Sequence, residues 1–393
     1  MKKIISLLLC VSALFFLNTP AMAANKTENT SITNLSDFEV RAKSAVLMEA
    51  NTGKILYSQN EKEKASPASV TKIMTLLLVA EAISEDRISI NDTVVISSHA
   101  ASMGGSQVFL EEGERMSVEE LLKCTVIASA NDAAVALAEH VGGSEAIFVS
   151  MMNKRAGELG MENTNFENVT GLDDSTKNHL TTAEDIAIMS RELIKHEIIT
   201  KYSSLWQDSI RNGEFTLTNT NRLVRFYEGC NGLKTGSTDK AGYCISATAK
   251  RGEMQLIAVI MGSETRDIRN AEAKALLDYG FSNFALFEKE ETALENTEVL
   301  YGTKDEAMLY SSPFSTVISK SEIKKVEVIY ELPKSVEAPI KAYSPVGKIT
   351  YKIGEKIIGT SDVYIKEEIE KISFYNIFFR ILESLFICNT NKE

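Results

Sequence analysis

The sequence predicts a mixed α/β protein of the α+β kind: an antiparallel sheet flanked by helices, then a small all-β domain and a tail helix. Three observations support this class. Strand-like runs open the chain's first half, helical periodicity fills its middle, and strand-like runs return over residues 232–261. This order favours one sheet built from both ends of a domain, with a helical subdomain inserted between them. Short strands then dominate residues 290–365, and the last segment has one apolar helical face.

The composition is that of an ordinary globular protein. The chain has 393 residues, 44% hydrophobic and 24% charged, which suits two or three domains with a sizeable core. Its formal net charge is −12 and its lysines and arginines form no dense basic block, so no nucleic-acid partner is expected. The cysteines and histidines lack zinc-site spacing. For Cys230 and Cys244, the sequence is compatible both with a disulfide and with two buried free thiols.

The N-terminus has the features of a secretory signal peptide over residues 1–23. Lys2 and Lys3 precede an apolar run over residues 4–17, and a small-residue Ala21-Met22-Ala23 site follows. The run is shorter than the ~20 residues that span a bilayer, which favours cleavage after Ala23 over a transmembrane anchor. Residues 24–38 then form a polar, flexible leader, and the mature chain is expected outside the cytoplasm.

Residues 39–288 are expected to form the first domain, which begins with a hairpin around an Asn-Thr-Gly turn. Apolar residues recurring every three or four positions predict the helices, and β-prone runs predict the strands. In chain order the elements are hairpin strands at 44–48 and 54–57, helices at 69–83, 118–126, 131–141, 144–159 and 182–195, strands at 232–236, 243–249 and 256–261, and a helix at 268–277.

Residues 290–365 are expected to form the all-β domain, with strands at 299–301, 308–310, 326–330 and 349–353. Residues 366–393 form the tail. Within it, Phe374, Phe378 and Leu385 share one face of an amphipathic helix predicted over residues 372–387. This helix is too short to cross a bilayer, so we expect it to lie in the membrane interface. A helix packed against the body of the protein is the alternative.

The first chemical motif is a serine and a lysine at the start of the predicted helix over residues 69–83. Ser69 and Lys72 stand three positions apart, which places both side chains on one helix face. A serine hydroxyl is a poor nucleophile and needs a neighbouring base. Lysine can be that base where burial and nearby positive charge lower its pKa. The motif alone is weak, because Ser321 and Lys324 repeat it in the β-rich region without partners.

Two further motifs follow in the same chain. Ser129-Ala130-Asn131 lies between two predicted helices, where the hydroxyl can relay a proton and the amide can hold a lysine. Alone, Ser-x-Asn is more often a loop or a helix cap. Lys234-Thr235-Gly236 occurs once, on a predicted strand, where its side chains can bind a carboxylate and glycine admits a substrate backbone. Together and in this order, the three motifs are typical of β-lactamases and penicillin-binding proteins.

The chain resembles the D-alanyl-D-alanine carboxypeptidases, which are low-molecular-mass penicillin-binding proteins with a β-lactamase/transpeptidase-like fold. The resemblance also includes the β-rich domain and the tail, and it covers residues 45–53, 65–75, 128–134, 168–174, 181–185 and 232–243. It implies a serine enzyme that trims peptidoglycan pentapeptides at the extracytoplasmic face of the cell membrane. It also implies inhibition by β-lactams and no need for a metal or other cofactor.

The resemblance implies roles for the motif residues. Ser69 attacks the carbonyl between the two terminal D-alanines, Lys72 takes its proton, and Ser129 helps to pass a proton to the departing D-alanine. Asn131 holds Lys72 and the substrate amide. Lys234 binds the terminal carboxylate and keeps Lys72 neutral. The other expected binding residues are Thr235, Gly236, Ser237 and Arg269, with the backbone N–H groups of Ser69 and Ser237 as the oxyanion hole.

Three other functions share parts of this pattern. A class A β-lactamase needs a Glu-x-x-x-Asn loop, and Glu158, Glu162 and Glu167 all lack an asparagine four positions on. An endopeptidase that cleaves cross-linked wall peptides would use the same residues on a different leaving group. A scaffold protein without turnover would have no need of two lysines near one serine.

Overall fold

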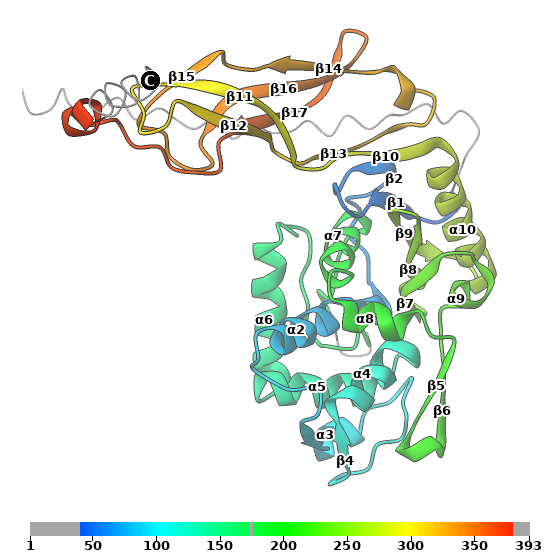
Figure 1. The fold of residues 1–393 in the computed structure, drawn as a ribbon. Helices are drawn as coiled ribbons and strands as arrows, with labels where there is room; N and C mark the ends of the chain where they lie inside the picture. The colour runs from blue at the N-terminus through cyan, green and yellow to red at the C-terminus, as the bar shows by residue number, and fades with distance from the viewer. Residues whose placement is uncertain (1–39, 173–175, 380–393) are drawn as a thin grey trace, which may run out of the picture. The chain divides into compact units, whose positions relative to one another are not determined.

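The computed structural model describes residues 40–172 and 176–379 of the chain, drawn as a ribbon in Figure 1. The predicted signal peptide and leader lie outside the described residues. So do Asp173, Asp174 and the second half of the predicted tail helix, residues 380–387.

A five-stranded antiparallel sheet forms the centre of the first domain, and it confirms the predicted mixed fold. Its strand order is β2-β1-β9-β8-β7, so strands from both ends of the domain pair side by side. The bounds are β1 Ser44–Glu49, β2 Ile55–Gln59, β7 Cys230–Thr238, β8 Gly242–Arg251 and β9 Met254–Ser263.

The two faces of this sheet are covered by different helices, α7 (Ala183–Leu193) and α10 (Arg266–Asn283), as Figure 1 shows. Successive side chains of a strand point to opposite faces. Accordingly, Val46 belongs to the core shared with the helical subdomain, whereas Leu47 packs in the core that contains residues of α10. Both faces are therefore apolar, which explains the near-continuous hydrophobic runs of β1 and β9.

The helical subdomain lies between β2 and β7 in the chain. The five helices predicted there are present, and the structure adds short elements that the sequence did not predict. In chain order, the predicted and the added elements together are the 3-10 turn η1 (Ala68–Thr71), α2 (Lys72–Ser84), β3 (Thr93–Val95), α3 (Ser98–Ala101), β4 (Arg115–Ser117), α4 (Val118–Ile127), α5 (Asn131–Gly142), α6 (Glu145–Glu158), α7, α8 (Glu197–Ser203), β5 (Gln207–Ile210), η2 (Arg211–Gly213), β6 (Phe215–Thr218) and α9 (Leu223–Phe226).

The C-terminal region forms a six-stranded sheet of order β14-β16-β17-β12-β11-β15 and a two-stranded sheet of β10 and β13. Ile369 is buried in the core of this region and bonds to Ile340 through the backbone. Its elements are β10 (Phe284–Lys289), β11 (Thr292–Leu300), β12 (Glu306–Ser311), β13 (Phe314–Ser319), η3 (Ile323–Lys325), β14 (Val326–Glu331), β15 (Ser335–Glu337), β16 (Pro345–Ile353) and β17 (Lys356–Tyr364).

The described cysteines are free thiols, which settles the alternatives for Cys230 and Cys244. In the antiparallel register of β7 and β8, Cys230 pairs with Ala249 and Cys244 pairs with Gly236. The two cysteines therefore lie near opposite ends of the strand pair, too far apart for a disulfide. Burial raises the pKa of both thiols to about 11, so neither is a reactive thiolate at neutral pH.

Candidate active site

Ser69 lies on the short 3-10 turn η1, whose last residue leads directly into α2. A continuous α-helix was expected from residue 69. In a 3-10 turn, side chains three positions apart eclipse each other. This places Lys72 Nζ 3.1 Å from Ser69 Oγ. His179 bonds to the neighbouring Thr71 at 2.8 Å, so the group beside the serine hydroxyl is the lysine amine.

Two glycines allow this turn to pack against distant parts of the chain. A Cβ on Gly236 would stand 2.7 Å from the backbone nitrogen of Ser69, so strand β7 can approach the turn only without a side chain there. A Cβ on Gly171, which has φ of +81°, would stand 1.8 Å from the Ala68 carbonyl oxygen. Ala68 itself has φ of +49°, an uncommon conformation for a residue with a side chain. The turn that carries Ser69 is therefore held in place by its surroundings.

The Lys72 side chain is completely buried and surrounded by hydrogen-bond acceptors. Its amine lies 2.6 Å from Asn131 Oδ1 and 2.9 Å from the carbonyl oxygen of Thr170. Burial lowers the pKa of Lys72 well below its usual value, and the positive charge of Lys234 lowers it further. These effects favour the neutral amine, the form that can accept a proton.

The second lysine lies beside the second serine. Lys234 Nζ donates to Ser129 Oγ at 2.7 Å and to the Thr235 carbonyl oxygen at 2.9 Å. Ser129 has φ of +62° and connects α4 to α5, so the link between two helices turns its hydroxyl toward β7. Burial lowers the pKa of Lys234 to about 7, and Arg269 adds to this. A bound anion would favour the protonated lysine and raise this pKa.

A cavity of about 170 Å³ opens over these groups. It is lined by Ser69, Ser106, Ser129, Thr220, Thr235, Gly236, Ser237, Arg266 and Arg269. Arg269 is buried, and its guanidinium donates to Asn270 Oδ1 at 2.9 and 3.1 Å. The lining is polar and cationic, and the described residues contribute no carboxylate to it. Such a site suits a substrate that carries a negative charge.

One wall of this cavity comes from the loop between α3 and β4, which places Ser106 at the site. The backbone N–H of Asn131 donates to the Ser106 carbonyl oxygen at 2.7 Å. The side-chain amide of Asn131 donates to the Gly104 carbonyl oxygen, also at 2.7 Å. Further along the loop, the backbone N–H of Val108 donates to the Asp132 carboxylate at 3.0 Å. The loop is thus held by the helix that supplies Asn131.

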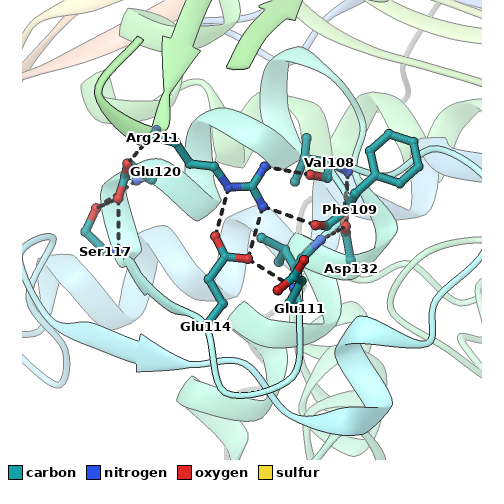
Figure 2. A network of polar contacts seen from close by, with 9 residues as sticks. Val108, Phe109, Glu111, Glu114, Ser117, Glu120, Asp132 and Arg211 are labelled. Carbon is teal, nitrogen blue, oxygen red and sulfur yellow. Dashed lines mark hydrogen bonds and ion pairs between the residues drawn. The ribbon is translucent and has the colours of Figure 1, made fainter. Parts of the chain in front are cut away.

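A second clamp fixes the same loop from the outside, as Figure 2 shows. Arg211 forms a two-bond ion pair with Glu114, at 2.8 and 3.0 Å. Its guanidinium also donates to the carbonyls of Val108 and Phe109, at 3.0 and 3.2 Å. Planar guanidinium groups suit several acceptors at once. The η2 turn is thereby tied to the loop that carries Ser106.

The structure brings all nine predicted site residues to one place. Ser69, Ser129, Thr235, Gly236, Ser237 and Arg269 line the cavity, and Lys72, Asn131 and Lys234 contact them from behind. Sequence reasoning missed Ser106, Thr170, Thr220 and Arg266. Thr170 and Arg266 had weak signals, because Thr170 precedes a glycine in a resembling stretch and Arg266 lies one helical turn before Arg269. Ser106 and Thr220 are loop residues with no local signal.

Comparison with known proteins adds independent findings. The sequence profile for D-alanyl-D-alanine carboxypeptidase matches residues 28–265, and that for the C-terminal domain of penicillin-binding protein 5 matches residues 281–371. The D-alanyl-D-alanine carboxypeptidase DacF of Bacillus subtilis is 41% identical over 389 residues, which cover 97% of this chain and 98% of that protein.

Solved structures of penicillin-binding proteins are similar to this one. Penicillin binding protein 5 from Haemophilus influenzae has 32% sequence identity and a TM-score of 0.76, and the match covers 86% of this chain and 100% of that one. Penicillin-binding protein D2 from Listeria monocytogenes, in its ampicillin-bound form, has 30% identity and a TM-score of 0.58. That match covers 63% of this chain and 100% of the other.

Proposed function

Since the chain belongs to the D-alanyl-D-alanine carboxypeptidase family and is a serine-type peptidase, we propose that Ser69 is its nucleophile and Lys72 its general base. The observation that carries this assignment is the 3.1 Å contact between Ser69 Oγ and the buried amine of Lys72. A base must lie within hydrogen-bond reach of the proton it takes, and its pKa must permit the neutral form. Lys72 meets both conditions.

In this mechanism Ser69 Oγ attacks the carbonyl between the two terminal D-alanines of a peptidoglycan pentapeptide while Lys72 Nζ takes its proton. The backbone N–H groups of Ser69 and Ser237 bind the oxygen on which negative charge develops. Ser129 passes a proton to the departing D-alanine amine as the carbon–nitrogen bond breaks. Water then hydrolyses the acyl-enzyme and frees Ser69.

The substrate carboxylate gives the cationic end of the cavity its role. Lys234, Thr235 and Arg269 form a carboxylate grip, because together they present an ammonium, a hydroxyl and a guanidinium at one end of the cavity. Asn131 has a separate task, since its side-chain oxygen already holds Lys72. A β-lactam carries a carboxylate beside a reactive amide, so it would enter the same cavity and acylate the same serine.

Incubation of the purified protein with a labelled penicillin, followed by peptide mapping, tests the assignment. We expect one adduct, on the peptide that contains Ser69, because among the described residues this is the hydroxyl that contacts the Lys72 amine. The Ser129 and Ser237 peptides provide internal controls in the same digest. Label on either of them would contradict the proposal, and rapid repeated release of hydrolysed penicillin would point to a β-lactamase.

We further propose that residues 1–23 export the chain and that its tail attaches it to the extracytoplasmic face of the membrane. The described start of the tail supports this, because residues 374–379 are helical and carry exposed aromatic side chains. Phe374 is 81% exposed and Tyr375 is 74% exposed. Such a surface suits the bilayer interface. Among the described residues, no helix has both the length and the apolar character for a membrane span.

Deletion of the tail should release the protein from membranes and leave its activity on soluble peptides unchanged. The deletion should begin at Ser373, because residues 369–372 still bond to the β-rich region through the backbone. Fractionation of cells that express the full and shortened chains would measure the change. A shortened chain that stays on membranes would count against the interfacial helix, provided that its labelled-penicillin acylation shows it is folded.

A further inference from the structure

A second cavity, of about 450 Å³, adjoins the catalytic one and has no role in the reaction described so far. It is lined by Trp206, Thr218, Asn219, Thr220, Arg222, Phe226 and Arg266. We call it the outer cavity. It shares Thr220 and Arg266 with the catalytic cavity, whereas Ser69 lines only the catalytic one.

The outer cavity lies next to the carboxylate grip. Thr235 Oγ1 donates to Thr220 Oγ1 at 2.9 Å, so the grip and the shared wall are in direct contact. Arg266 precedes Arg269 by three residues on the first turn of α10, which places both side chains on one side of that helix. Seen from Ser69, the outer cavity therefore begins where the terminal carboxylate of the substrate is held.

The charge of the outer cavity is strongly positive and unpaired. Arg222 and Arg266 are both exposed, and across residues 40–172 and 176–379 neither forms a salt bridge with a carboxylate. Burial lowers the pKa of Arg269 to about 10, and the charges of Arg266 and Arg222 contribute to this effect. Both guanidinium groups are therefore within electrostatic reach of the grip. Two uncompensated arginines at one cavity are notable on a chain whose net charge is −12.

The floor of the outer cavity also has an apolar part. The Trp206 and Phe226 rings lie 6.4 Å apart, and the Arg225 guanidinium lies 5.3 Å from the Trp206 ring centre. Aromatic rings bind aliphatic chains, while free guanidinium groups bind carboxylates. The cavity thus combines a surface for a methylene chain with a site for an anion.

We propose that the outer cavity is a leaving-group subsite for D-amino acids and peptides that carry a second carboxylate. A departing D-alanine ends at its own carboxylate and its methyl group, so it does not fill this space. A D-amino acid with a longer side chain would hold its first carboxylate in the grip and extend the side chain into the outer cavity. This inference rests on the proposed function, because it uses the same nucleophile and the same grip.

The chemical steps are those of the proposed D-alanine release, but the departing amine belongs to a different D-amino acid or peptide. Ser69 Oγ forms the ester bond, the carbon–nitrogen bond breaks, and the departing amine takes the proton, after which water hydrolyses the ester. The subsite would therefore extend the leaving groups from D-alanine to D-amino acids and peptides that carry a second carboxylate.

Three synthetic peptides that differ only in the last residue test the subsite on the full chain. They end in acyl-D-alanyl-D-alanine, acyl-D-alanyl-D-glutamate and acyl-D-alanyl-D-glutamine, of which the last two have nearly the same shape. We expect kcat/KM to be on the order of tenfold higher for D-glutamate than for D-glutamine, as for a hydrogen bond to a charged group. In the double variant Arg222→Gln/Arg266→Gln this ratio should fall to about one.

Arg115→Gln is the matched control, because it removes an exposed arginine from β4, outside both cavities. It should leave the ratio unchanged, and labelled-penicillin acylation would show that the double variant is folded. A ratio near one in the unmodified protein, or a ratio that survives in the double variant, would overturn the subsite. If D-alanine itself is not released, the proposed function fails, and the subsite fails with it.

Discussion

Replacement of Ser69 by alanine is expected to lower the rate of D-alanine release from a pentapeptide at least about a thousandfold, the order seen when a catalytic nucleophile is removed. The physical reason is that the covalent step needs an oxygen at this position. Lys72 and Asn131 can still hold each other after the change, since their 2.6 Å bond does not involve Ser69. The loss should therefore appear in turnover, with folding little affected.

Ser321→Ala is the control for this experiment. Ser321 begins the second Ser-x-x-Lys sequence of the chain, with Lys324 three positions later. In the structure its hydroxyl bonds to Ser319, at 2.9 Å, and it has no contact with the catalytic cavity. Release of D-alanine should be unaffected in this variant. An equal loss in both variants, or no loss in Ser69→Ala, would refute Ser69 as the nucleophile.

The residues that local patterns place correctly are those whose partners are near in sequence or on a regular element. Ser69 and Lys72 are three residues apart, so both an α-helix and a 3-10 helix bring their side chains together. Lys234 and Thr235 lie in the middle of the nine-residue strand β7, where alternation assigns each side chain to a face. Four strands of the main sheet, β1, β2, β8 and β9, were recognisable from their apolar runs, whereas β7 has a single aliphatic residue, Leu233.

The remaining features depend on distant contacts. The turn at Ser69 is 3-10, and the glycines that press against it, Gly171 and Gly236, lie about 100 and 170 positions away. The β3–β4 and β5–β6 hairpins have strands of three or four residues, too short for a clear period. Ser106 lines the cavity on a loop that bonds to Asn131 and Arg211, residues 25 and 105 positions away. No local sequence pattern predicts such long-range hydrogen bonds.

Lys72 shows how this long-range packing produces reactivity, and it leads to the second large effect. Its pKa is lowered by burial and by Lys234, which lies on a strand 162 positions further along the chain. Lysine has an ordinary pKa near 10.4, so an exposed lysine at residue 72 would be protonated and unable to act as a base at neutral pH. The start of α2 sets the position of the proposed base, and the assembled domain sets its charge state.

Lys72→Arg is therefore expected to slow acylation by labelled penicillin roughly 100- to 10,000-fold at pH 7, the usual contribution of a general base. A guanidinium group stays protonated and cannot accept the Ser69 proton, although its side chain has about the length of the lysine side chain. Lys154→Arg, on the exposed face of α6, is the control and should acylate normally. Normal acylation in Lys72→Arg would exclude Lys72 as the base.

The pH dependence of acylation gives an independent check on the same residue. Only the neutral amine accepts a proton, so the rate should fall as pH drops through the Lys72 pKa and level off above it. Lys234→Gln removes a positive charge that lowers this pKa, so the Lys72 pKa should rise and the acid limb should move to higher pH. This shift is separate from the weaker binding that loss of the grip will cause, because it changes the position of the limb and not only its height. An acid limb that stays in place in Lys234→Gln would show that the two lysines are not electrostatically coupled.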